Sequence, residues 1–150
     1  MKVKQIMVKK VISASPDTEI IKVAELLTIN RIHGLPIISN NIVLGIITET
    51  DFFVKDLAQV YLPSYIDFLK KAEFTERISR KKKKEMNKLL NLTAQDIMTQ
   101  PCFTIFADTD VKELVNIFKT KHYFTIPVVD TGGKMTGIIT QADIINLIKV

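Results

Sequence analysis

The sequence predicts an α+β fold (α/β-like) made of two βαββα repeats that pack as a pseudo-two-fold pair, with a helical insert between them. The nonamer GIITETDFF at residues 45–53 returns as GIITQADII at residues 137–145. Each copy follows a helical pattern and a short apolar run, in the same order. Similarity within one chain at a fixed spacing is typical of a duplicated structural unit. The chain has 150 residues and is 47% hydrophobic, so the repeats together can bury a sizeable core.

The repeat extends well beyond the nonamer. The segment IMVKKVISASPDT at 6–18 aligns with IMTQPCFTIFADT at 97–109, and RIHGLPIIS at 31–39 aligns with HYFTIPVVD at 122–130, in both cases 91 residues apart. The two nonamers lie 92 residues apart, so the second copy contains one extra residue. We place that residue in the turn where DTGGK replaces SNN, because turns accept insertions easily.

Each repeat begins with a short first strand and a turn signal, SPDT or ADTD, and an amphipathic helix follows. Apolar residues at positions i, i+3, i+4 and i+7 form one face of each helix. In the first copy they are Ile20, Val23, Ala24 and Leu27, and in the second copy Val111, Leu114, Val115 and Phe118. Asp17 and Asp108 lie just before these helices, where an acidic residue suits the N-cap and the helix dipole.

A buried hairpin and a closing helix complete each repeat. The apolar runs LPII and IPVV predict one strand, and VLGIIT and MTGIIT predict the next. Their nearly continuous apolar character indicates burial on both faces. These elements place the first repeat at 1–60 and the second at 95–150. The residues between them, 61–94, are too many for a bare loop, and their pattern predicts amphipathic helices with a basic run.

The positive charge of the chain is concentrated in that insert. The formal net charge is +5, and RKKKK at 80–84 alone supplies five positive charges. Such a run is typical of a solvated helix face or a tether, and docking to an acidic protein, nucleic acid or anionic lipid is the alternative. No aromatic residue interleaves with the lysines, which argues against nucleic acid as a partner.

Targeting signals are not evident in the sequence. No apolar run approaches the roughly 18 residues needed to span a bilayer. The start, MKVKQIMVKK, has no apolar core of a secretory signal. We therefore expect a cytoplasmic protein without a membrane partner.

Residues suited to catalysis or metal binding are scarce. The chain has one cysteine, Cys102, and two histidines, and it lacks a GxxxxGK[ST] phosphate loop, a His-Glu-x-x-His pair and a Cys-x-x-Cys pair. Asp51 and Asp143 fall at equivalent positions of the repeats, so pseudo-symmetry places them in separate clefts and not as one acid–base pair. The sequence therefore predicts no catalytic residue, no metal site and no enzyme activity.

Three motifs together resemble the cystathionine-β-synthase (CBS) domain pair, also called a Bateman module. They are the leads Gln5-Ile6-Met7 and Asp96-Ile97-Met98, the apolar-Pro-apolar-apolar strand, and Gly-apolar-apolar-Thr-x-x-Asp before the last helix. The resemblance covers most of the chain and leaves out the insert. It implies a regulatory module without catalysis that needs no cofactor. As an effector it would bind AMP, ADP, ATP or S-adenosylmethionine in clefts between the repeats.

The resemblance also implies which residues hold the ligand. Asp51 and Asp143 would bind the ribose hydroxyls, because an ionised carboxylate accepts two hydrogen bonds side by side. Backbone N–H groups at the start of the same closing helices can receive an anionic phosphate. The residues expected near phosphate, ribose or adenine are Thr48, Thr140, Ser13, Thr104, His33, Gly34, Phe124 and Thr125.

A structural interpretation of the same residues stays open. The tetrapeptides at 48–51 and 140–143 also fit the capping box, which stabilises a helix and binds nothing. The two interpretations are compatible, because a threonine can cap the helix while the aspartate faces a cleft.

The two copies differ around the strand proline. Arg31 and His33, assigned to the first cleft, would meet phosphate. His122, Tyr123 and Phe124, assigned to the second cleft, offer more stacking surface and less charge. The difference predicts that the two clefts differ in affinity or in ligand.

The expected function is that of an adenine-nucleotide or adenosyl sensor, whose ligand favours one packing of the repeats. Because the chain ends at its last helix, we expect it to signal to a separate effector protein, and the resemblance implies a homodimer. One alternative is a structural or protein-interaction module that binds no ligand. The other is an anion or nucleic-acid binder that uses the basic insert.

Overall fold

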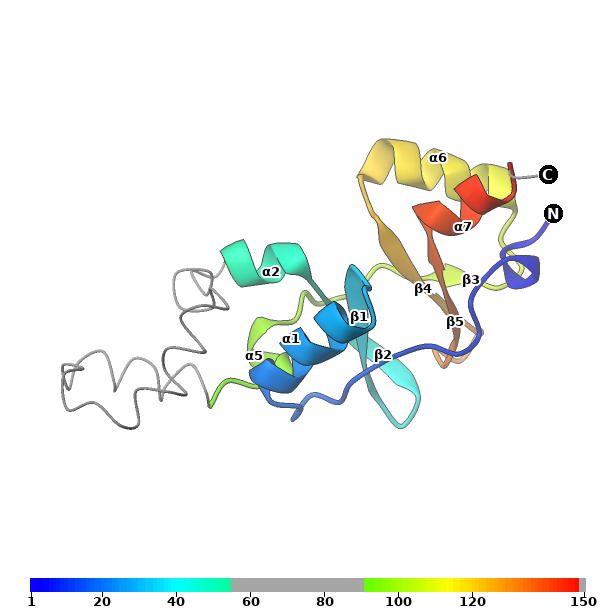
Figure 1. Cartoon of the computed structure of the whole chain (residues 1–150). Helices are drawn as coiled ribbons and strands as arrows, with labels where there is room; N and C mark the ends of the chain where they lie inside the picture. Colours follow the sequence, from blue (N-terminus) through cyan, green and yellow to red (C-terminus); the bar gives the residue numbers. More distant parts are fainter. Residues whose placement is uncertain (55–90, 149–150) are drawn as a thin grey trace, which may run out of the picture.

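The computed structural model describes residues 1–54 and 91–148, and Figure 1 shows them as two adjacent α+β units. Residues 61–90 of the predicted helical insert, with the basic run at 80–84, lie outside the described residues, whereas residues 91–94 are described and lead into the second repeat. The first unit contains α1 (Ile20–Ile29), β1 (Gly34–Ser39), β2 (Ile42–Thr48) and α2 (Glu49–Val54). The second contains β3 (Ile105–Phe106), α6 (Val111–Lys121), β4 (Thr125–Val129), β5 (Met135–Thr140) and α7 (Gln141–Asn146). Each repeat is preceded by a segment that we call its lead, residues 1–12 for the first repeat and 91–103 for the second. Two short helices, η1 (Val3–Gln5) and α5 (Ala94–Ile97), lie in these leads.

The strand pairing has the same pattern in both units. β1 pairs with β2 and β4 pairs with β5, both antiparallel and both with an irregularity in register. β3 pairs with β4 in parallel. In the first unit a single parallel bridge from Ala14 to Ile37 stands where β3 pairs with β4. The predicted βαββα order and the pseudo-symmetric pair are thus confirmed, with the first strand of the first copy reduced to one bridge.

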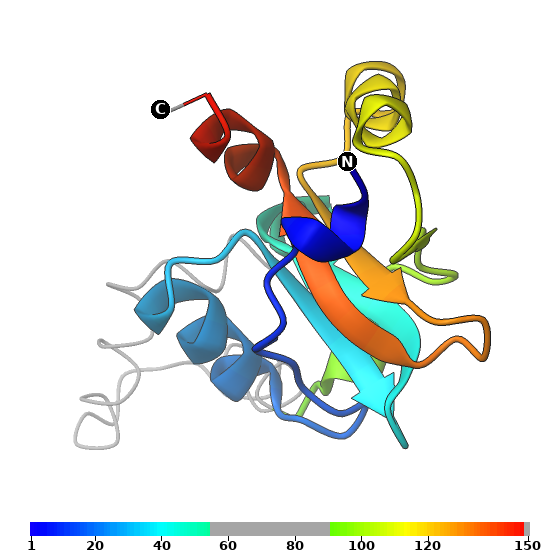
Figure 2. The same cartoon turned by 90° about the vertical axis from the view of Figure 1, so that its right-hand side faces the viewer.

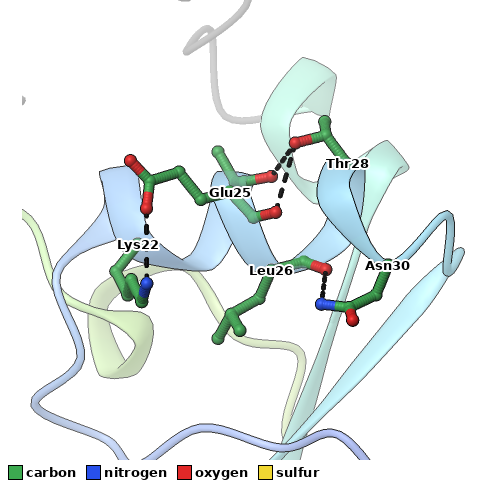
Figure 3. A network of polar contacts seen from close by, with 6 residues as sticks. Lys22, Glu25, Leu26, Thr28 and Asn30 are labelled. Atoms are coloured by element: carbon green, nitrogen blue, oxygen red, sulfur yellow. Dashed lines mark hydrogen bonds and ion pairs between the residues drawn. The ribbon is translucent and has the colours of Figure 1, made fainter.

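The amphipathic helix α1 forms as its pattern predicts. Ile20, Val23 and Leu27 are buried, and they lie on one face because of the helical period. At the C-terminal end the Thr28 hydroxyl donates to the Ala24 carbonyl at 2.9 Å, and the Asn30 amide donates to the Leu26 carbonyl at 2.8 Å (Figure 3). These side chains supply donors to backbone carbonyls at the end of the helix.

The predicted N-caps are wrong by two residues. The residues that precede α1 and α6 are Glu19 and Asp110, and only Asp110 caps with its side chain, which accepts from the Lys112 N–H at 2.9 Å. Asp17 accepts a hydrogen bond from the Ser15 hydroxyl instead. Asp108 forms an ion pair with Lys4 at 2.6 Å, which lowers the pKa of this carboxyl group.

The helices begin later because the other repeat supplies their first hydrogen bonds. The N–H of Ile20 donates to the carbonyl of Leu92, and the N–H of Val111 donates to the carbonyl of Met1. Each helix start is therefore fixed by a lead that belongs to the other copy in sequence. Sequence pattern within one copy contains no signal for that contact.

The two repeats exchange their leads. Ala94, Ile97 and Met98 come from the lead of the second repeat and lie in the core of the first unit. Val3, from the lead of the first repeat, lies in the core of the second unit. Figures 1 and 2 show the N-terminal segment starting beside the second unit before it crosses to α1. The pair is therefore one interlocked structure and not two separate domains joined by a linker.

The exchanged leads explain the glycine of each Gly-Ile-Ile-Thr motif. A Cβ atom on Gly137 would lie 2.6 Å from the Met7 sulfur and 2.9 Å from the Val8 carbonyl oxygen. A Cβ atom on Gly45 would meet Met98 and the Thr99 carbonyl in the same way. The lead crosses the hairpin so closely that a side chain at Gly45 or Gly137 would collide with it. Glycine at this position of the motif therefore leaves room for the lead of the other repeat.

Gly137→Ala is expected to lower the free energy of unfolding by about 1–3 kcal/mol, because overpacking forces the lead away from β5. Chemical denaturation measures the change. Gly132→Ala is the matched control, since a Cβ atom there would meet only the Asp130 carboxylate at 3.3 Å. Equal stability of the two variants would contradict the close crossing.

Candidate functional site

A cleft of about 560 Å³ lies between the two repeats, beside the start of α7. Its volume is in the range of small-ligand sites, roughly 300–1,000 Å³. Both repeats and the first lead line it. The lining residues are Val8, Lys10, Val11 and Ile12 of the lead, Arg31, Ile32, His33 and Gly34 before and at β1, Phe124 and Thr125 at β4, and Ile138, Thr140, Gln141, Ala142, Asp143 and Ile145 of β5 and α7.

The carboxylate of Asp143 is held in place by Thr140. The backbone N–H and the hydroxyl of Thr140 both donate to Oδ2 at 2.7 Å, and the Asp143 N–H reaches the Thr140 hydroxyl at 3.3 Å. The capping-box interpretation is therefore confirmed for this pair. Among the described residues no donor contacts Oδ1 of Asp143. One carboxylate oxygen fixes the helix, and the other is available to the cleft.

Basic side chains of the first repeat share the cleft with this carboxylate. Lys10 and Arg31 both line it, as does His33. His33 is also close to Glu49, with Nδ1 and Oε1 3.3 Å apart, in an exposed pair. The remaining wall is mainly apolar, and the Phe124 ring at its edge is 68% exposed. The cleft thus combines an acceptor, cations and an apolar surface.

The cleft brings together most of the residues that the sequence singled out, but not in the predicted division. His33 and Gly34 of the first copy line the same cleft as Phe124 and Thr125 of the second. The assignment of Arg31 and His33 to one cleft and Phe124 to the other is wrong. The reason is that the strands meet across the pseudo-axis, where a Cβ atom on Gly34 would lie 3.0 Å from Thr125 Cβ.

Four of the predicted site residues do not line this cleft, namely Asp51, Thr48, Ser13 and Thr104, and several residues that do line it were not predicted. The polar lining residues that the sequence did not predict are Lys10 and Gln141, and Val8 is an apolar one. A comparison of the two copies could have singled out Lys10, because the aligned residue of the second lead is the uncharged Pro101 and the two copies therefore differ in charge at this position.

Asp51 has a different environment from Asp143. It is only 8% exposed, and it does not line the described cleft. Its Oδ2 accepts from the Thr48 N–H at 2.8 Å, and its Oδ1 accepts from the Thr99 hydroxyl at 2.6 Å. Both oxygens of this carboxylate are therefore engaged within the protein.

Other chemistry is limited in the described part of the chain. Burial raises the pKa of the Cys102 thiol to about 11, so the reactive thiolate is scarce near neutral pH. Within residues 1–54 and 91–148, no group of three or more His, Cys, Asp or Glu side chains could hold a metal ion. None of the helices described is both long and apolar enough to cross a membrane.

Comparison with known proteins bears directly on this geometry. The CBS domain family model matches residues 3–57 and 94–150. Protein MJ1426 of Methanocaldococcus jannaschii is 28% identical over 152 residues, covering 97% of this chain and 89% of that protein. Two further archaeal relatives are longer, and the chain spans 58% and 45% of their length.

Two solved structures share the architecture. CBSX2 in complex with AMP has a TM-score of 0.73 at 20% identity, covering 99% of this chain and 96% of that one. The CBS domain pair of protein MJ0100 from a complex with 5-methylthioadenosine and S-adenosyl-L-methionine has a TM-score of 0.71 at 26% identity, with the same coverage. The family model matches both repeats and most of the chain. The chain belongs to the CBS domain family, as a tandem pair of CBS domains.

Proposed function

We propose that the chain is a regulatory module that binds an adenosyl ligand in the cleft beside Asp143. The observation that supports this most directly is a fixed carboxylate, with one oxygen that no described donor contacts, in the same cleft as basic side chains of the other repeat. An adenosine phosphate needs both in one cavity, because its ribose diol donates to a carboxylate and its phosphates are attracted by basic side chains. Structures of similar CBS pairs contain AMP, or 5-methylthioadenosine with S-adenosyl-L-methionine.

The ribose would bind to Asp143. Its Oδ2 is already oriented by Thr140 at 2.7 Å, so the carboxylate needs little reorganisation to accept a hydroxyl on Oδ1. Hydrogen bonds to an ionised group are shorter and stronger than those between neutral groups. The adenine ring would lie against the apolar wall, where Phe124 offers an exposed aromatic face.

The charge of the cleft favours nucleotides over S-adenosylmethionine. Lys10 and Arg31 would attract the phosphates of AMP, ADP or ATP, and they would repel a sulfonium cation at the same place. Arginine is also suited to phosphate because its planar group donates two parallel hydrogen bonds. We therefore propose a phosphorylated adenosine as the ligand.

Regulation would follow from the position of the cleft. A ligand there would contact both repeats and the exchanged lead, so its affinity depends on how the two units are packed. Exposed apolar side chains at the closing helices, Phe53 on α2 and Ile148 just after α7, support a homodimer or a partner protein whose binding depends on this packing. We propose that the effector is a separate protein and that the module acts in the cytoplasm.

Calorimetric titration of the purified protein with AMP, ADP, ATP and S-adenosylmethionine at physiological salt tests the proposal. We expect micromolar binding of at least one adenosine phosphate, and weaker binding of S-adenosylmethionine. No heat with any of the four ligands, from protein with a cooperative thermal transition, would exclude the sensor function and favour an interaction module. Affinity that falls steeply with salt and does not depend on the identity of the nucleotide base would instead indicate a general anion binder.

A further inference from the structure

We propose that the chain binds one adenosyl ligand and not two, because the Thr99 hydroxyl donates to the Asp51 carboxylate oxygen whose counterpart in Asp143 is left open. The inference rests on the proposed function of the Asp143 cleft. It concerns the second, repeat-related position, where the family motif is intact in sequence.

Thr99 and Val8 are equivalent residues of the two exchanged leads. The backbone of Val8 exchanges two hydrogen bonds with Ile138, both at 2.9 Å. The backbone of Thr99 exchanges two with Ile46, at 2.9 and 3.2 Å. Both residues thus cross the strand that ends in the Thr-x-x-Asp motif at the same register. What differs is the side chain, a hydroxyl in one copy and a methyl group in the other.

The presence or absence of this hydroxyl determines whether Oδ1 of the nearby aspartate accepts a hydrogen bond from the protein. Thr99 donates to Oδ1 of Asp51 at 2.6 Å, a short distance typical of a bond to an ionised acceptor. At the other position Val8 has no proton to donate, and the described residues leave Oδ1 of Asp143 without a donor. A hydroxyl of the protein therefore already donates to the Asp51 oxygen that a ribose hydroxyl would have to share.

The surrounding residues differ in the same direction. Glu49, two residues before Asp51, stands where the Asp143 cleft has the neutral Gln141, and its carboxylate lies 3.3 Å from His33. Pro101 stands at the position of Lys10, so one cation of the described cleft has no counterpart. A phosphate chain would meet less positive charge and more negative charge in the second position.

Aromatic rings also distinguish the second position from the described cleft. Phe103 and Tyr123 are stacked, with ring centroids 4.8 Å apart and planes inclined by 18°. They correspond in the repeat to Ile12 and Ile32, which line the wall of the described cleft. The two rings stack on each other and are 38% and 36% exposed, so the wall of the second position is built differently from the aliphatic wall of the described cleft.

The test transfers the hydroxyl from one lead to the other. Val8→Thr places a donor beside Asp143, so we expect ligand affinity to fall by about 10- to 150-fold, the value of one hydrogen bond to a charged group. Val8→Ser supplies the same donor in a smaller side chain, should the threonine disturb packing. Thr99→Val, the reverse change, is the matched control and should leave the affinity of the Asp143 cleft within about twofold, since Thr99 does not line it.

Calorimetry of the wild-type chain with AMP or ATP gives the stoichiometry directly, and we expect one ligand per chain. Two ligands per chain would overturn the inference while leaving the proposed function standing. Unchanged affinity in both folded Val8 variants would overturn it as well. Absence of binding in the wild-type chain would instead contradict the proposed function itself, so the two failures are distinguishable.

Discussion

Asp143→Asn is expected to weaken binding of an adenosine phosphate by about 10- to 150-fold. The substitution keeps the size of the side chain and one oxygen, which can still accept from Thr140. It replaces the second oxygen with an amide group that donates, and it removes the charge. One hydrogen bond to a charged group contributes roughly 1.5–3 kcal/mol, which gives that range of affinity. Calorimetric titration of the variant with AMP and ATP measures the change.

The chain offers a matched control for this substitution. Asp96 forms the same capping box in α5, where the Thr93 N–H and hydroxyl donate to its Oδ2 at 2.8 and 3.1 Å. Asp96 does not line the cleft. Asp96→Asn therefore repeats the structural disturbance without the proposed contact, and we expect the affinity of the wild-type chain. Equal losses in the two variants would show that Asp143 acts only as a cap.

The fold could be predicted because its determinants are local and repeated. The helical period of residues such as Ile20, Val23 and Leu27, and the two apolar strands, each specify an element without reference to the rest of the chain. The duplication then supplied a check, since every element occurred twice in the same order. The N-caps failed because a contact from the other repeat sets the start of each helix, and the period of one segment does not encode it.

The site could be predicted only in part for a related reason. The Thr-x-x-Asp motif points to Asp51 and Asp143 equally, and the sequence places both at the start of a closing helix. Whether the carboxylate is available depends on a residue of the other lead, Thr99 or Val8, which lies far away in sequence. Which lead residue lies next to which aspartate can be recognised only when the exchange of the leads is known.

The exchange itself leads to the second large effect, in stability. Ile97 belongs to the second repeat in sequence, yet it is 2% exposed in the core of the first unit. Ile97→Ala is expected to lower the free energy of unfolding by about 2–5 kcal/mol, the usual result of removing a large buried aliphatic side chain. Chemical denaturation followed by circular dichroism measures the loss. A loss of that size is a large part of the roughly 5–15 kcal/mol that stabilises a typical domain.

The place of the damage distinguishes an exchanged lead from a local one. If Ile97 supports the first unit, amide hydrogen exchange in Ile97→Ala should accelerate first in β1 and β2, because local opening follows the loss of local packing. Gln95→Ala, an exposed change in the same short helix, should alter stability by no more than about 0.5 kcal/mol. Faster exchange confined to β4 and β5 would mean that the lead packs on its own repeat. A lead that packs on its own repeat could not bring Thr99 to the Asp51 carboxylate. The measurement therefore also tests the contact on which single-site binding rests.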